Sequence, residues 1–193
     1  MRWRLFRGSA ARRAREAELS TFRAELDAAA ERHDAATGAW PALQDGLLGR
    51  LALRADALGL TDDDDGALEL EMINGLRELA ALVLAVERDG LPLLETQHRV
   101  ITGESCRFSA PATRVFDAND SNGAEGASGR LFLTDRRVVF LGPSVTGVPW
   151  PSIAGIARTG RDVVLSGASR RYRFRLNTFA DALRATWLAE RLR

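Results

Sequence analysis

The sequence has very few of the residues that form disulfides or metal sites. Its 193 residues include one cysteine, Cys106, and two histidines, His33 and His98. A single cysteine excludes an intramolecular disulfide, and this set is too small for a Cys/His zinc site of standard spacing. We therefore expect no metal and no cofactor.

The sequence also lacks long apolar runs. The longest, residues 79–86, has eight residues, whereas a membrane-spanning helix needs about 20. The opening MRWRLFR lacks the apolar stretch of a signal peptide. Lysine is absent, all 27 basic residues are arginine, and alanine is abundant, a composition typical of GC-rich bacterial genomes. We therefore expect a bacterial, cytoplasmic protein.

The formal net charge is only +1, but the charges are unevenly distributed. Residues 1–100 hold 13 arginines against 18 acidic residues, and residues 101–193 hold 14 against 8. A generic nucleic-acid binder usually carries a large basic excess, so no nucleic-acid partner is expected. With 46% hydrophobic residues the chain can bury a core.

Residues 16–90 have the apolar periodicity of amphipathic helices. A first helix ends at Thr37-Gly38, a second starts at Trp40-Pro41 and is capped by Gly59, and a third covers about 64–89. The heptad stripe of the first is Leu19, Phe22, Leu26, Ala29, His33 and Ala36. The stripe of the third is Leu68, Met72, Leu76, Leu79, Val83 and Val86.

These helices predict an N-terminal helical hairpin or three-helix unit, because short connections favour antiparallel neighbours. The strict heptad of the first helix leaves a second interpretation open, a coiled coil formed in trans. A homo-oligomer through the first helix is therefore an alternative to intramolecular packing.

Residues 100–193 change to period-2 alternation, which predicts strands. The first, residues 106–116, contains Pro111, which implies an edge, a bend or a bulge. A hairpin follows at 130–134 and 137–142 around Asp135-Arg136, with one buried face through Leu131 and Leu133. Further strands are expected at 145–150, 152–158, 161–166 and 170–176, then a helix capped by Asn177-Thr178. The fold class is α+β, with a small β-barrel or sandwich closed by a C-terminal helix that carries Trp187.

This half resembles the GRAM and bacterial pleckstrin-homology-like (PH-like) domains. Gly103-Glu104 precedes the first strand, GRLFLTDRRVVFLG (129–142) is similar to the family hairpin, and VPWPSI (148–153) to its crossing segment. The resemblance implies a module that binds lipids, peptides or proteins and no enzyme activity. Lipid-binding members carry basic residues after the first strand, whereas the corresponding loop here, residues 117–129, has three acids and no arginine.

One strand places arginines on a single face, because alternate side chains point to opposite sides. This arginine ridge consists of Arg171, Arg173 and Arg175, with Arg158, Arg161 and Arg170 as candidate extensions. Three interpretations stay open: a face that binds an anionic lipid or acidic peptide, a solvated strand face, and a docking site for the acidic helices.

The N-terminal segment 1–15 combines arginines with aromatic side chains. Such a composition is typical of segments that bind at a membrane surface, although a transit peptide, a nucleic-acid contact or a frayed terminus would have it too. The candidate membrane-surface residues are Arg2, Trp3, Arg4, Phe6, Arg7, Arg12 and Arg13.

Residues for catalysis are scarce. Cys106 lies on a strand and is expected in the core, and His98 beside Glu95 or Glu104 is a weak proton-transfer pair. We therefore expect a non-enzymatic interaction module that has no catalytic residues and binds a protein partner. We expect an anionic membrane surface, at the inner face of the membrane, as a second partner. The alternative function is anionic-lipid binding through the arginine ridge.

Overall fold

The structure is a computed structural model that describes residues 3–32, 40–60, 66–96, 98–116 and 126–193, without the side chains of residues 3–9, 32 and 40–45. The chain divides into two compact units, Met1–Ala81 and Leu82–Arg193. Within the described ranges, no helix is long and apolar enough to cross a membrane.

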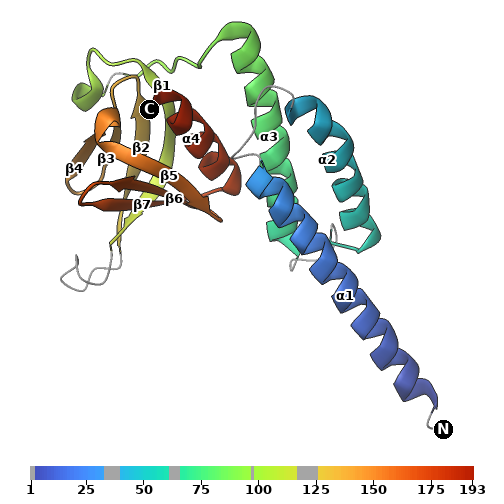
Figure 1. Ribbon diagram of the computed structural model, residues 1–193. Helices are drawn as coiled ribbons and strands as arrows, with labels where there is room; N and C mark the ends of the chain where they lie inside the picture. Colours follow the sequence, from blue (N-terminus) through green and yellow to red (C-terminus); the bar gives the residue numbers. More distant parts are fainter. Residues whose placement is uncertain (1–2, 33–39, 61–65, 97, 117–125) are drawn as a thin grey trace. The chain divides into compact units, whose positions relative to one another are not determined.

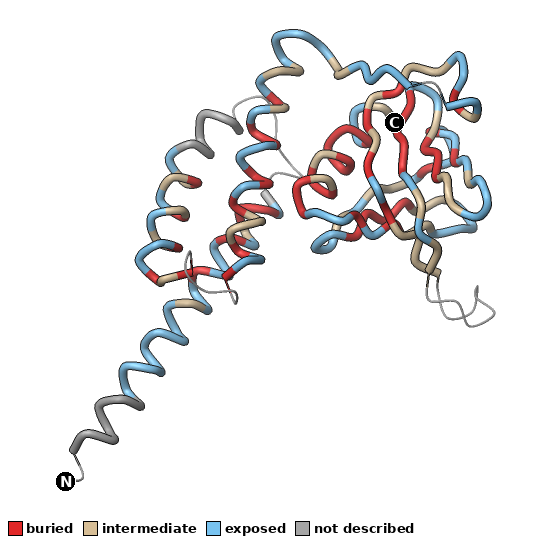
Figure 2. Tube along the Cα trace, turned by 180° about the vertical axis from the view of Figure 1, so that it is seen from behind, coloured by how far each residue is buried: buried red, intermediate tan, exposed pale blue. Residues whose placement is uncertain are grey.

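The first unit is built from three helices, α1 (Trp3–Arg32), α2 (Trp40–Ala57) and the first part of α3 (Ala67–Asp89) (Figure 1). The predicted stripe of α1 is confirmed at Phe22, Leu26 and Ala29, which are buried, whereas Leu19 is only half-buried. His33 and Ala36 lie outside the described residues. Residues 10–18, by contrast, are exposed on every side of α1 (Figure 2).

The buried face of α3 differs from the expected one at its start. Leu68 is 53% exposed, whereas the neighbouring Glu69 is only 4% exposed. The reason is an ion pair, because Arg23 of α1 places its Nε 2.5 Å from a Glu69 carboxylate oxygen. The core side of α3 is then formed by Ile73, Leu76 and Leu79.

Glycine ends α2 as expected. Gly59 has φ +70°, a conformation that residues with a Cβ rarely adopt. The amide of Leu60 donates to the carbonyl of Ala55 at 3.0 Å, and that of Gly59 to Asp56 at 2.8 Å. These two bonds form a Schellman motif, which satisfies carbonyls that the helix end would otherwise leave without donors.

The second unit is a seven-stranded antiparallel sheet in the order β4-β3-β2-β1-β7-β6-β5. The strands are β1 (Cys106–Val115), β2 (Gly126–Thr134), β3 (Arg137–Leu141), β4 (Val145–Pro149), β5 (Ile153–Thr159), β6 (Asp162–Gly167) and β7 (Arg171–Leu176). The sheet folds over so that β5, β6 and β7 cross β1 to β4, and α4 (Phe179–Leu192) packs against strands of both halves (Figure 1). This is the expected α+β fold with a PH-like sandwich closed by a C-terminal helix.

The main core lies between the sheet and α4. Phe140, Phe174 and Leu183 are buried there, and the predicted Trp187 is 5% exposed (Figure 2). At the start of α4, the side chain of Thr178 accepts a hydrogen bond from the amide of Asp181 and confirms the expected cap.

The expectation of a single buried face on β2 is wrong. Phe132 is 5% exposed, because the other side of the sheet carries a second, smaller core. It consists of Ile101, Cys106, Phe132 and Val139. Ile101 belongs to a short 3₁₀ turn, Arg99–Ile101, which the strand periodicity could not predict.

Strand β1 is central, yet one part of it has a strand neighbour on a single side. It pairs with β2 along its length, and β7 pairs with it only from Ala112 to Val115. At its start, Leu94 forms an isolated bridge to Cys106. Residues 107–111, which include Pro111, therefore lie between these two contacts with no strand neighbour on that side within the described ranges.

Candidate functional site

The residues that carry the family resemblance hold the fold together. Glu104 is nearly buried and its carboxylate accepts hydrogen bonds from Arg137 Nε at 2.9 Å and from the Thr134 hydroxyl at 2.7 Å. The Thr134 hydroxyl also accepts from the amide of Arg137 at 3.0 Å. The indole of Trp150 donates to the Thr134 carbonyl at 2.9 Å. We call Glu104, Thr134, Arg137 and Trp150 the motif cluster.

The electrostatics of the motif cluster favour an ionised Glu104. Burial by itself raises the pKa of Glu104, but the hydrogen bonds from Arg137 and Thr134, with the charges of Arg137 and Arg136, lower it below its ordinary value. Asp135 is also committed to the fold, because its carboxylate accepts from the amide of Ser105 at 2.9 Å. The motif cluster therefore has no carboxylate left over for a ligand.

The arginine ridge is partly neutralised by a buried acid. Asp162, 5% exposed, lies on β6 opposite Arg175 and beside Arg173. Its carboxylate is 2.7 Å from Arg173 Nε and 2.8 Å from Arg175 Nε. Burial raises the pKa of Asp162, but the bonds and charges of the two arginines lower it below its usual range. With Arg171, the ridge carries a formal charge of +2 instead of +3.

The register places the candidate extensions of the ridge elsewhere. Arg158 pairs with Val163, which pairs with Phe174, so it lies on the opposite face of the sheet from the three ridge arginines. There its guanidinium is 4.8 Å from the ring of Phe179. Arg161 lies in the turn before β6, and Arg170 precedes β7 and lines a pocket of about 420 Å³ near the end of β4. β7 itself is a central strand, so its charges do not serve to protect a sheet edge.

The strongest candidate for a binding site is a pocket in the second unit. The sequence patterns do not indicate this pocket. Its volume is about 230 Å³. It lies beside the stretch of β1 that pairs with β2 on one side and, among the described residues, has no strand neighbour on the other. We call it the α4 pocket. It is lined by Leu82, Pro92, Leu94, Arg107, Phe108, Ser109, Asp181, Arg184 and Leu188.

The α4 pocket combines apolar walls with one uncompensated cation. Arg184 is 2.8 Å from Asp181, so these two charges balance. Arg107 donates from Nη1 to the carbonyls of Leu91 and Pro92, at 3.2 and 3.3 Å. Among the residues that the structure describes, Arg107 has no carboxylate partner, and its buried Nε has no acceptor. The pocket therefore carries a net positive charge on an apolar base.

One lining residue, Leu94, and its neighbour in the chain, Leu93, are exposed leucines. Leu93 is 65% and Leu94 41% exposed, although the amide of Leu94 is fixed by a 2.8 Å bond to the Cys106 carbonyl. Adjacent exposed apolar side chains next to an apolar pocket are a feature of interaction surfaces.

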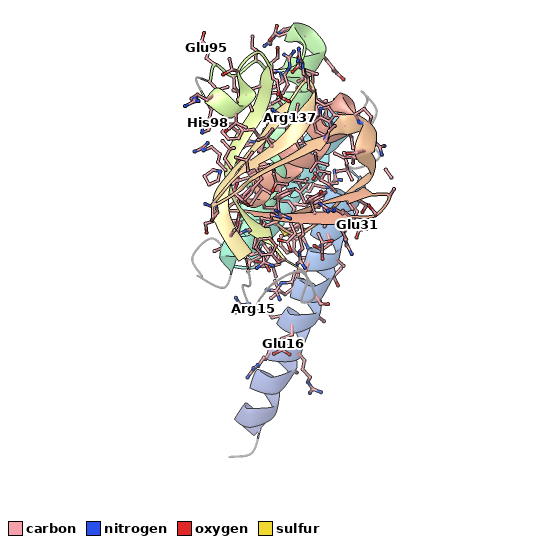
Figure 3. The ribbon with its side chains drawn as sticks, turned by 90° about the vertical axis from the view of Figure 1, so that its left-hand side faces the viewer. Arg15, Glu16, Glu31, Glu95, His98 and Arg137 are labelled. Atoms are coloured by element: carbon pink, nitrogen blue, oxygen red, sulfur yellow. The ribbon has the colours of Figure 1, made fainter. Side chains whose placement is uncertain are left out.

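Among the described residues, His98 has no hydrogen bond or ion pair to Glu95 or Glu104. His98 is exposed, its Nδ1 accepts from the amide of Val100, and Glu104 is engaged in the motif cluster. Figure 3 shows His98 and Glu95 at the margin of this unit and Arg137 among the strands. Burial raises the pKa of the Cys106 thiol. In the described ranges, no group of three or more His, Cys, Asp or Glu side chains could hold a metal ion.

The candidate membrane residues are only partly described. Arg12 and Arg13 are exposed on α1, and Arg12 pairs with Glu16 at 2.9 Å (Figure 3 labels Glu16). Arg2 and the side chains of Trp3, Arg4, Phe6 and Arg7 lie outside the described residues. The acidic loop is shorter than expected, because residues 126–129 belong to β2, and residues 117–125 lie outside the description.

Comparison with known proteins gives likenesses of part of the fold. No protein-family model and no curated protein sequence matches the chain. A C-terminal domain of an unknown protein from Leishmania infantum is 15% identical with a TM-score of 0.39, over 48% of this chain and 88% of that one.

Two fragments with DH and PH domains are also similar. That of p115-RhoGEF is 11% identical, covers 75% of this chain and 47% of its own, and has a TM-score of 0.39. That of PDZ-RhoGEF, in complex with activated RhoA, is 11% identical at the same TM-score, over 76% and 52%. The chain thus spans about half the length of these fragments, and at such identities and TM-scores the likenesses carry no argument about function.

Proposed function

We propose that the chain is a non-enzymatic interaction module whose PH-like unit binds a protein partner at the α4 pocket. The observation that carries this proposal is the apolar pocket with the exposed Leu94 in its lining. It lies on a stretch of β1 that has no strand neighbour on one side among the described residues. Apolar side chains are exposed there on fixed backbone, so a partner can bury them without ordering a loop first.

The remaining reactive groups support a binding role. Among the described acids, Glu104 and Asp162 have lowered pKa values, and both are ion-paired to arginines that join neighbouring segments of the fold. Ion-pair networks that hold a fold together perturb carboxylates in this way too. The proposal therefore assigns no catalytic residue.

The GRAM-type assignment and a bacterial origin belong to the same proposal. The assignment is supported by the way in which the motif residues meet: the Glu before β1, the Thr and Arg of the hairpin and the Trp of the crossing segment contact one another in the motif cluster. The helices of the first unit would then dock a partner or a second copy, and the N-terminal arginines would keep the protein peripheral to the inner face of the membrane.

Anionic-lipid binding through Arg171, Arg173 and Arg175 is the second candidate. The three guanidinium groups on one sheet face favour this candidate. Asp162 argues against it, because its carboxylate is ion-paired with two of them, those of Arg173 and Arg175. A headgroup phosphate would have to compete with a buried carboxylate that already accepts charge-assisted hydrogen bonds from both Arg173 and Arg175.

The two candidates are separated by peptide selection and vesicle sedimentation on the full chain. We expect a random 12-residue peptide library to yield binders that are lost on Leu94→Glu and kept on Val145→Glu. Val145 is 56% exposed on β4 and does not line the pocket, so it is a matched control. If no peptide is enriched and the chain sediments with anionic vesicles through the three ridge arginines, the lipid function replaces the protein-binding one.

A further inference from the structure

We infer that the α4 pocket takes a peptide segment in which a carboxylate lies next to an apolar side chain. This inference rests on the proposed protein-binding function and names the chemistry of its ligand. It is argued from the charge of the pocket, from its apolar walls and from the open side of β1.

The charge argument starts from Arg107. A partly buried guanidinium normally faces an acid or several acceptors, because leaving it without them costs the desolvation of the charge. Arg107 meets only two backbone carbonyls, at 3.2 and 3.3 Å, and no carboxylate among the described residues. The only acid of the pocket lining, Asp181, is paired to Arg184. A carboxylate that enters the pocket could therefore accept hydrogen bonds from Arg107 without breaking an existing ion pair.

The apolar argument concerns the floor and rim. Phe108 and Leu188 are buried and form the floor, and the 41% exposed Leu94 forms part of the rim. A volume of about 230 Å³ accommodates one or two apolar side chains and is below the range of about 300–1,000 Å³ of drug-sized ligand sites. The dimensions thus favour an anchor side chain of a peptide over a whole small-molecule ligand.

The backbone argument concerns the length of the site. Between the bridge at Cys106 and the first β7 partner, Ala112, β1 is without a strand neighbour on this side in the described ranges. Arg107, Phe108 and Ser109 of this stretch all line the pocket. A short extended segment could therefore run along β1 with its anchor on Phe108 and its carboxylate at Arg107.

The test uses three matched probes on the isotope-labelled full chain, followed by NMR. The probes are acetyl-Leu-Glu-Leu-amide, acetyl-Leu-Gln-Leu-amide and acetyl-Leu-Lys-Leu-amide, titrated at low salt. We expect the Glu peptide to shift the amides of Leu94, Phe108, Ser109 and Leu188 with a Kd about fivefold or more below that of the Gln peptide, as charge-assisted bonds to a guanidinium require. The Lys peptide should bind weakest, and the preference for Glu should shrink at high salt.

Variants decide whether Arg107 supplies the preference. Arg107→Gln should abolish the Glu-over-Gln preference, Arg107→Lys should keep most of it, Leu94→Glu should abolish binding, and Val145→Glu should leave binding unchanged. Because Arg107 also holds the Leu91 and Pro92 carbonyls, the amide spectrum of each variant without peptide serves as the folding control.

Each result has one meaning. Equal binding of the Glu and Gln peptides overturns the inferred chemistry but leaves protein binding at the pocket in place. Shifts elsewhere, or none, overturn the pocket as the peptide site, and the library selection then decides whether the chain binds proteins at all. Hexanoate shifting the same amides as strongly as the Glu peptide would overturn the peptide assignment in favour of a fatty-acid site.

Discussion

The motif cluster predicts how the stability of the second unit depends on Arg137 and on pH. Glu104 is only 9% exposed, and Arg137, 32% exposed, provides its charged partner at 2.6 Å. Removing one partner of a buried pair costs about 3–5 kcal/mol, and the partial exposure of Arg137 reduces this. We expect Arg137→Met to lower the free energy of unfolding by about 2–3 kcal/mol and Glu104→Gln by about 1.5–2 kcal/mol. The double variant should show a coupling of about 1.5–3 kcal/mol.

The pH dependence gives the same prediction a sign. The pKa of Glu104 is lowered in the fold, so the unfolded chain binds more protons in acid. The stabilisation is then present above the unfolded value of about 4.3 and is lost as pH falls through the lower folded value. Glu104→Gln should flatten this decline below about pH 4.5. In Arg137→Met, only the Thr134 hydrogen bond and the Arg136 charge still oppose the effect of burial on the pKa of Glu104, so the acid decline should be smaller than in the native chain.

The assay is urea unfolding of the full chain, followed through the indole NMR signal of Trp150, which is 3% exposed and bonded to Thr134. Glu190→Gln is the control, because Glu190 forms an ion pair with Arg193 in which each side chain is about one-third exposed. This substitution should change the free energy of unfolding by less than about 0.5 kcal/mol. An acid decline in Glu104→Gln as steep as that of the native chain, or a coupling near zero, would refute the role given to the motif cluster.

Three further predictions concern other regions. Asp162→Asn should raise the charge of the arginine ridge to +3 and increase the fraction of protein that sediments with anionic vesicles at low salt. Adding Arg171→Ala should reverse this gain. No change in the sedimented fraction would exclude the ridge as an anion-binding site. Leu26→Asp should unfold the first unit, seen as lost helical circular dichroism, because Leu26 is 1% exposed, whereas Leu53→Asp at a 73% exposed position should be tolerated; an intact fold in both would contradict the packing of α1. Gly59→Ala should lower the free energy of unfolding, measured by heat or urea, by about 1 kcal/mol, because Gly59 has a φ of +70°. Gly49→Ala should raise it by a similar amount, because no atom lies within 4 Å of the added Cβ. Equal effects of the two substitutions would contradict the role of Gly59 as a cap.

The sequence predicted most of the elements because their signals are local. The caps at Gly59 and Thr178 and the alternation of β7 depend on residues close in the chain. The register of β5, β6 and β7 depends on distant pairing, which periodicity does not report. For that reason Arg158 was grouped with the ridge although it lies on the opposite face of the sheet.

The candidate site was harder to predict because each decisive feature joins separate segments. Asp162 meets Arg173 and Arg175 only through the pairing of β6 with β7. The α4 pocket brings together α3, the segment before β1, β1 and α4. The one signal that could have pointed to it is Leu91-Pro92-Leu93-Leu94, an apolar run placed directly after a helix end and outside any predicted strand. Its exposure could not be read from composition.

The motif cluster changes what its sequence signature can report. Glu104, Thr134, Arg137 and Trp150 bond to one another and to the backbone, so selection for a folded sandwich is enough to preserve them. A chain could exchange its ligand, or lose it, and still carry the signature. Searches with these residues would therefore retrieve proteins that share the same stabilising contacts. To group such proteins by partner, the residues of the α4 pocket would have to be compared separately.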